Sequence, residues 1–162
     1  MTLLSLLLLA QAIVQAPAVS PASPAFPPAD TTKLSLVLVQ TVSETDPQPL
    51  CPQPNCTSMF LGRYKDAVVL AGPALPAEFT ARIEMGSPWN KPYRLALIVE
   101  QRDGQEPLVR AETGFNVRTG EGCFEFKQTG PLNWHPTGEG FYWQRQVLCL
   151  KDPTFTPVML RP

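Results

Sequence analysis

The sequence predicts an all-β fold, a small antiparallel barrel of the OB-like type, with an immunoglobulin-like β-sandwich as the alternative. Apolar and polar side chains alternate along several segments with the two-residue period of a strand that buries one face. Proline is abundant, at 19 of 162 residues, and charged residues make up 17%, below the typical ~25%. No helical periodicity of useful length follows the first 16 residues. Strands joined by proline-rich loops account for all three features.

Residues 1–16 are predicted to be a signal peptide. Thr2–Val14 is largely apolar and contains the leucine-rich block Leu3–Leu9, which is too short to span a bilayer as a helix. Small-residue cleavage patterns end at Ala12 and at Ala16, and the second is favoured. Because no lysine or arginine precedes the leucine block, an uncleaved membrane anchor and a misassigned start codon stay open as alternatives.

A Pro/Ala-rich linker is expected over residues 17–32, because Pro17–Asp30 contains five prolines and favours an extended, polyproline-like chain. The β-barrel domain is expected over residues 33–152, and residues 153–162 form a C-terminal tail.

The predicted barrel begins with the strand Lys33–Ser43, which is apolar on both faces in its centre and therefore belongs in the middle of a sheet. A hairpin follows over Phe60–Met85, whose second half alternates strictly. Two prolines inside the hairpin cannot donate to a sheet ladder, so the chain must leave the sheet near Ala71 and rejoin it near Glu78.

Four further strands are expected after the hairpin. Asp103-Gly104 is the best signal for a tight turn between the first two of them. A twelve-residue loop, Thr129–Gly140, separates the last two. The expected strands are Tyr93–Gln101, Leu108–Arg118, Cys123–Lys127 and Phe141–Leu150.

Four cysteines behind a signal peptide predict two disulfides formed in an oxidising compartment, so the protein is expected to be secreted or periplasmic. Of the three possible pairings, we favour Cys51–Cys56, which closes a proline-rich loop, together with Cys123–Cys149, which joins neighbouring strands. A four-thiolate metal site does not suit the spacings of four and 25 intervening residues, because zinc ribbons use paired short knuckles. We therefore expect no metal and no cofactor.

The residues give little support to catalysis, and we predict that the protein is not an enzyme. His135 is the only histidine, so a base-assisted nucleophile would have to use it. No Gly-x-Ser-x-Gly elbow, phosphate loop or dinucleotide fingerprint is present. Thirteen basic and fourteen acidic side chains leave a net charge of −1, which favours no nucleic-acid partner.

Aromatic residues in and near the loops are the best candidates for a binding surface, because such anchors often carry protein or sugar contacts. Packing against the end of the barrel is the simpler interpretation of the same side chains. The candidates are Trp89, Tyr93, Trp134, His135, Tyr142 and Trp143.

Three features follow one another between Lys33 and Gln101: the apolar strand Leu36–Val42, an interrupting cystine loop, and a strand, Gly-Pro turn, strand arrangement over Tyr64–Ile83. In this order they resemble a netrin-like module, the OB-type barrel of the tissue inhibitors of metalloproteinases. The resemblance implies a barrel but not inhibition. Inhibitors of that family chelate the catalytic metal through an N-terminal cysteine, whereas the first cysteine here is Cys51.

We therefore expect a secreted or periplasmic, non-catalytic β-domain that binds a protein or a component of the cell envelope, with no membrane span after signal cleavage. One alternative is a structural envelope domain whose retained leader anchors it to the membrane. The other is a hydrolase that depends on His135.

Overall fold

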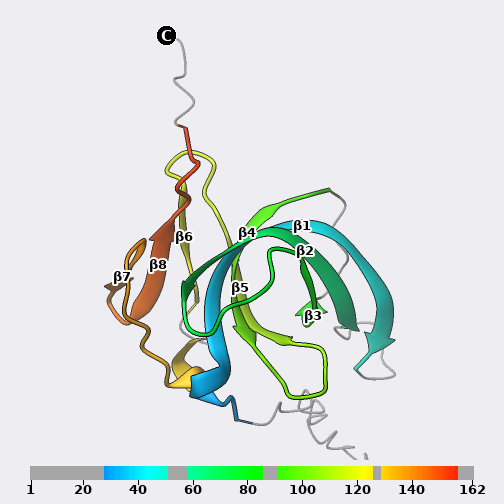
Figure 1. Ribbon diagram of the computed structural model, residues 1–162. Coiled ribbons are helices and arrows are strands. Elements are labelled where there is room, and N and C mark those ends of the chain that lie inside the picture. The colour runs from blue at the N-terminus through cyan, green and yellow to red at the C-terminus, as the bar shows by residue number, and fades with distance from the viewer. Residues whose placement is uncertain (1–27, 51–57, 86–90, 126–128, 157–162) are drawn as a thin grey trace, which may run out of the picture.

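The computed structural model describes residues 28–50, 58–85, 91–125 and 129–156 (Figure 1). Five strands close a barrel, and three more form a second sheet beside it. The barrel consists of β1 (Leu34–Pro49), β2 (Ser58–Ala71), β3 (Phe79–Met85), β4 (Arg94–Glu100) and β5 (Leu108–Gly114). The second sheet consists of β6 (Glu121–Cys123), β7 (Phe141–Gln144) and β8 (Val147–Lys151). Two short 3-10 helices, η1 (Thr31–Lys33) and η2 (Gly130–Leu132), precede β1 and β7.

The barrel closes in the order β1-β2-β3-β5-β4, with β4 pairing back onto β1. This closed sheet confirms the predicted all-β barrel and is consistent with an OB-like arrangement. The alternative, an immunoglobulin-like sandwich, is not formed by the described strands. One neighbouring pair, β3 with β5, is parallel and meets at Arg82 and Leu108. A purely antiparallel barrel was expected, but an odd number of strands cannot close with every neighbour antiparallel.

β1 and β4 are apolar on both faces because they lie between two cores. The interior core fills the barrel, and the outer core lies between the barrel wall and the second sheet. From β1 and β4 the interior core receives Val37, Val39, Leu95, Leu97 and Val99, and the outer core receives Leu34, Leu36, Leu38, Ala96 and Ile98. The second sheet and its flanks cover the outer core with Phe124, Leu148 and Leu150.

β2 and β3 form the predicted hairpin. Ser58 lies opposite Met85 and Tyr64 opposite Phe79, and the chain leaves the sheet between Ala71 and Phe79. Gly72, directly after β2, has a φ of +87°, and a Cβ there would lie 2.0 Å from the carbonyl oxygen of Leu34. Only glycine fits this close crossing of two backbones.

The Asp103-Gly104 turn joins β4 to β5 as predicted, with Gly104 at a φ of +68°. The Lys33 ammonium lies 2.6 Å from the Asp103 carboxylate and so links the turn to η1.

β1 and β5 end at positions other than those predicted. β1 continues to Pro49 instead of ending at Ser43, because beyond Gln40 the described ladder pairs it only with β2, and an edge tolerates proline. β5 ends at Gly114 rather than Arg118, because the Asn116 side chain accepts hydrogen bonds from two following backbone N–H groups and forms a turn.

The C-terminal strands also differ from the prediction. β6 runs over Glu121–Cys123, earlier than the expected Cys123–Lys127. The single strand expected over Phe141–Leu150 is a hairpin of β7 and β8, which turns at Arg145 and Gln146 with φ values of 48° and 68°.

Contacts at both ends of the described chain attach it to the barrel. Ala29 packs against the outer core, and the Asp30 backbone N–H donates to Glu100 Oε1 at 2.9 Å. Glu100 also accepts from Arg110 Nε at 2.8 Å, and both of these side chains are buried. Near the C-terminus, Asp152 pairs with Arg94 at 3.0 Å and thereby joins the end of β8 to the start of β4. No described helix is long and apolar enough to cross a bilayer.

Candidate binding groove

The predicted loop Thr129–Gly140 begins with η2 and then crosses the end of the second sheet. Asn133 ends η2 in the left-handed conformation, with a φ of 45°, and its backbone N–H donates to the carbonyl of Gly130. Trp134 is half-buried and packs against the outer core with Leu132. His135, the next residue, is exposed. The loop therefore anchors one predicted binding residue and presents another to solvent.

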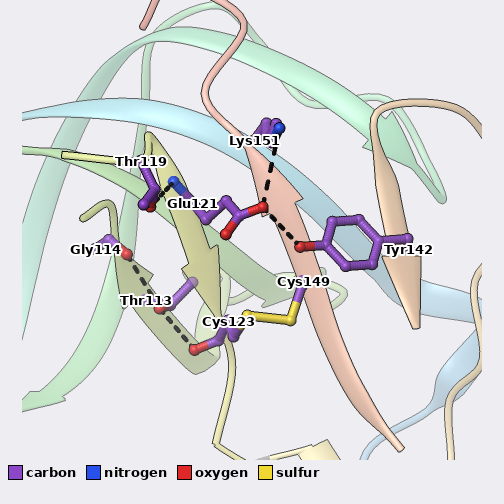
Figure 2. The surroundings of a disulfide bond; sticks show 8 residues. All are labelled: Thr113, Gly114, Thr119, Glu121, Cys123, Tyr142, Cys149 and Lys151. Carbon is purple, nitrogen blue, oxygen red and sulfur yellow. Dashed lines mark hydrogen bonds and ion pairs between the residues drawn. A yellow bond between two sulfur atoms is a disulfide. The ribbon is translucent and has the colours of Figure 1, made fainter. Parts of the chain in front are cut away.

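β7 presents its side chains to two different faces, because successive side chains of a strand point to opposite sides. Phe141 packs against the outer core, and Trp143, two residues on, shares its face with 37% of its surface exposed. Tyr142 lies on the other face, where its hydroxyl donates to Glu121 beside the Cys123–Cys149 disulfide (Figure 2). Tyr142 is exposed to a similar extent, 40%, but does not share a face with Trp143.

His135 and Trp143 meet where the loop passes β7. Their ring centroids are 5.1 Å apart and the rings are tilted by 48°. The two rings together line a pair of adjoining hollows of about 430 and 320 Å³. Pro136, Thr137, Gly138 and Phe141 complete the first hollow, and Thr129, Gly130, Asn133, Trp134 and Gln146 complete the second. We refer to these two hollows as the binding groove.

The chemistry of the binding groove is that of contact and hydrogen bonding. Among the residues that the structure describes, its lining has no serine, cysteine, carboxylate, lysine or arginine. Its two hydroxyl groups belong to Thr137, which is exposed, and Thr129, whose hydroxyl already donates to the Glu125 carbonyl at 3.5 Å. The described lining therefore offers His135 no carboxylate to orient it as the base of a catalytic triad.

The structure brings together Trp134, His135 and Trp143 of the six predicted binding residues. Tyr142 lies on the opposite face of its strand, and Tyr93 lies just before β4, where its backbone N–H donates to the Thr41 hydroxyl at 2.7 Å. The Lys91 ammonium lies 5.4 Å from the centre of the Tyr93 ring. Trp89 lies outside the described residues.

Asn133, Phe141 and Gln146 line the groove although none was among the predicted binding residues. Gln146 was missed because the predicted last strand ran through it. The polar run Gln144-Arg-Gln146 between two apolar segments is only a weak indication of a turn, because it lacks the glycine, asparagine or aspartate of the usual two-residue hairpin.

The Cys123–Cys149 disulfide is present and joins residues that lie directly opposite each other on β6 and β8 (Figure 2). Such a bond is compatible with an extracellular or periplasmic location. Cys51 and Cys56 lie outside the described residues. Groups of acidic, cysteine and histidine side chains suited to a metal ion do not occur among the residues that the structure describes.

The outer face of β2 and β3 offers a contrast to the groove, since OB barrels often bind ligands there. Its alternating outward positions hold aliphatic, charged and threonine side chains, with no aromatic ring among them: Leu61, Arg63, Thr80, Arg82 and Glu84. Arg63 pairs with Glu78 at 3.2 Å. This face lacks the aromatic platforms on which nucleic-acid bases stack.

Comparison with protein-family models, with curated proteins and with solved structures gives no match to this chain.

Proposed function

We propose that this chain is a secreted or periplasmic, non-catalytic binding domain that holds a protein or a component of the cell envelope in the binding groove. The observation that carries the proposal is the pair of exposed, touching rings of His135 and Trp143, which line both hollows. Exposed aromatic side chains with neighbouring polar groups are the usual anchors of binding sites.

The leader-like segment 1–16 and the disulfide support export. The barrel supports a scaffold role, since rigid sheets commonly present binding loops at their ends. We further propose that the barrel, and no other part of the chain, resembles a netrin-like module. A His135-dependent hydrolase is less well supported, because the described residues of the groove lining include no carboxylate, serine or cysteine to complete such a site.

Because His135 is the only histidine, its modification by diethyl pyrocarbonate tests the proposal at one residue. Intact cells or their envelope fraction and the purified protein are treated in parallel, and the peptide that carries His135 is quantified by mass spectrometry. We expect His135 to be protected in the native setting and to react readily in the purified protein.

Variants assign this protection to the groove. Trp143→Ala should abolish protection of His135 in the native setting, whereas Tyr142→Ala, a similarly exposed residue on the other face of β7, should leave it intact. Equal reactivity of His135 in the native setting and in the purified wild type would contradict the proposal. Retention of residues 1–16 in the mature protein, measured by its mass, would favour an anchored structural domain instead.

A further inference from the structure

The described residues that line the binding groove carry no carboxylate, ammonium or guanidinium group. None of these eleven residues is aspartate, glutamate, lysine or arginine. A phosphate, a carboxylate or an ammonium group entering the groove would lose hydration without gaining a fixed counter-charge. The composition of the lining therefore favours an uncharged ligand.

The two hollows differ in polarity, with Trp143 shared between them. The first is lined mainly by apolar groups, including Pro136 and Phe141, whereas the residues that line the second include Asn133 and Gln146, which have amide side chains. A ligand that fits both hollows needs an apolar face for the indole and polar groups along its rim. A sugar ring has this shape, with C–H groups on its faces and hydroxyl groups around its edge.

The hydrogen-bonding groups of the lining also match hydroxyls. The side chains of Asn133, Gln146 and Thr137 each both donate and accept, as a hydroxyl does. A polyproline peptide also has apolar faces, but its prolines lack N–H groups and its backbone offers acceptors only. The mixture of donors and acceptors therefore favours a saccharide over a proline-rich peptide.

The turn between β7 and β8 places Gln146 at the groove. Gln146 and Arg145 both adopt positive φ values in this two-residue turn, where Asn-Gly is the preferred pair. The turn imposes this conformation on both residues, so glycine would relieve backbone strain at either position. Gln146 lines the groove and Arg145 does not, so the two residues differ in their place relative to the groove and not in their backbone strain.

We propose that the binding groove takes a neutral saccharide, with a sugar ring stacked on Trp143 and its hydroxyls hydrogen-bonded to the amides of Asn133 and Gln146. This inference rests on the proposed function of the groove as the ligand site.

The test begins with the purified, oxidised full chain on an array of neutral and acidic glycans. Isothermal titration calorimetry then measures the best neutral glycan, an acidic glycan of equal length, and a synthetic peptide of residues 17–28 as the polyproline probe. We expect neutral glycans to bind with an affinity that changes little with salt. Trp143→Ala should weaken this binding at least about tenfold, since stacking on an aromatic ring provides much of the affinity.

The turn provides a matched pair of variants. Gln146→Gly should raise the midpoint of urea unfolding, because it relieves the positive φ, and should weaken glycan binding at least about threefold, through the lost hydrogen bonds. Arg145→Gly should raise the midpoint similarly and leave glycan binding unchanged. Gln146→Gly keeps the test decisive even if Trp143→Ala fails to fold.

The outcomes separate this inference from the proposed function. The saccharide assignment is overturned if the array retains no neutral glycan. It is also overturned if Trp143→Ala and Gln146→Gly both bind the glycan as tightly as the wild type does. If the protein binds the peptide but no glycan, and Trp143→Ala abolishes this binding, the saccharide assignment is also overturned. The groove would then remain a ligand site. If His135 is in addition equally reactive in the native setting and in the purified protein, the proposed function fails as well.

Discussion

Gly72 and Gly104 adopt similar left-handed conformations in very different surroundings. Gly72 has a φ of +87° and lies against the backbone of β1, where a Cβ would meet the Leu34 carbonyl oxygen at 2.0 Å. Gly104 has a φ of +68° in the β4–β5 turn, and a Cβ there would have no neighbour within 4 Å. Substitutions at Gly104 therefore measure the free-energy cost of the backbone conformation alone, whereas substitutions at Gly72 add the cost of a steric clash.

We predict that Gly72→Ala lowers the free energy of unfolding by at least about 3 kcal/mol, because the barrel must shift to accommodate the methyl group. Gly104→Ala should cost only about 1 kcal/mol, from the unfavourable φ alone. Urea unfolding followed by circular dichroism measures both. Equal losses in the two variants would show that β2 does not cross β1 as closely as described.

Glu112 is an acidic side chain on the interior side of the barrel wall. It lies directly opposite Leu97, a member of the interior core, and its Oε2 has no hydrogen-bond partner among the described residues. Burial raises the pKa of Glu112 above its usual value. Burial, together with the nearby carboxylates of Glu112 and Glu44, also raises the pKa of Tyr64.

The raised pKa of Glu112 predicts a pH dependence of stability. Between the ordinary glutamate pKa, about 4.3, and the raised value, the folded protein binds more protons than the unfolded chain. The contribution of Glu112 to the free energy of unfolding should therefore be greatest at low pH and fall as the pH rises through that range. Glu112→Gln should remove this decline, as measured by urea unfolding at several pH values. An unchanged pH profile in the variant would contradict the half-buried position of Glu112 on the interior side of the barrel wall.

Alternation along the sequence predicts the packing of β3 but not that of β5. In β3, Ala81, Ile83 and Met85 are buried, as their alternation indicates. In β5, the same pattern places Val109 and Ala111 on one face, but an irregularity in the β4–β5 ladder puts Val109 in the interior core and Ala111 in the outer core. A β-bulge adds a residue and so reverses the faces beyond it, which periodicity alone does not reveal.

The disulfide holds together the small second sheet. Cys123 lies in a strand of three residues, β6, whose ladder pairs it with β8 alone. The Thr113 hydroxyl adds a hydrogen bond from β5 to the Cys123 carbonyl at 2.9 Å (Figure 2). Short edge strands are weak on their own, so the covalent bond matters here.

We predict that the double substitution Cys123→Ala and Cys149→Ala lowers the free energy of unfolding by about 3 kcal/mol, since the bond closes a loop of 26 residues in sequence. The protein should still fold, because the two cores remain. Chemical denaturation under oxidising conditions measures the loss of unfolding free energy. Repeating the measurement on the variant with a reductant shows separately how the other two cysteines affect stability. A loss below about 1 kcal/mol would contradict a stabilising role for the bond.

The β7–β8 hairpin explains why the groove was only partly predictable. The sequence identified Trp134, His135 and Trp143 as candidates but assigned β7, the turn and β8 to one strand. A two-residue turn without glycine, asparagine or aspartate gives no standard signal, since Arg145 and Gln146 rarely adopt positive φ. The contribution of Gln146 to the groove follows only from the folded hairpin.

The molecule is organised around a barrel wall whose β1 and β4 strands are buried on both sides. The sequence predicted two-sided strands at β1 and β4, but it did not predict that separate layers cover the two faces. Alternation shows that a face is apolar and leaves open what covers it. Here the second sheet and the loop after η2 cover the outer face, and the binding groove forms where that loop meets β7.

The most direct test of the binding groove is fluorine NMR of the oxidised full chain labelled with 5-fluorotryptophan, with the Trp143 signal assigned from Trp143→Phe. The neutral glycan that the array retains most strongly is titrated into the protein. We predict that the Trp143 resonance shifts in a saturable manner, with the same Kd as calorimetry gives. A Trp143 resonance that stays fixed while calorimetry reports full binding would contradict the groove as the ligand site.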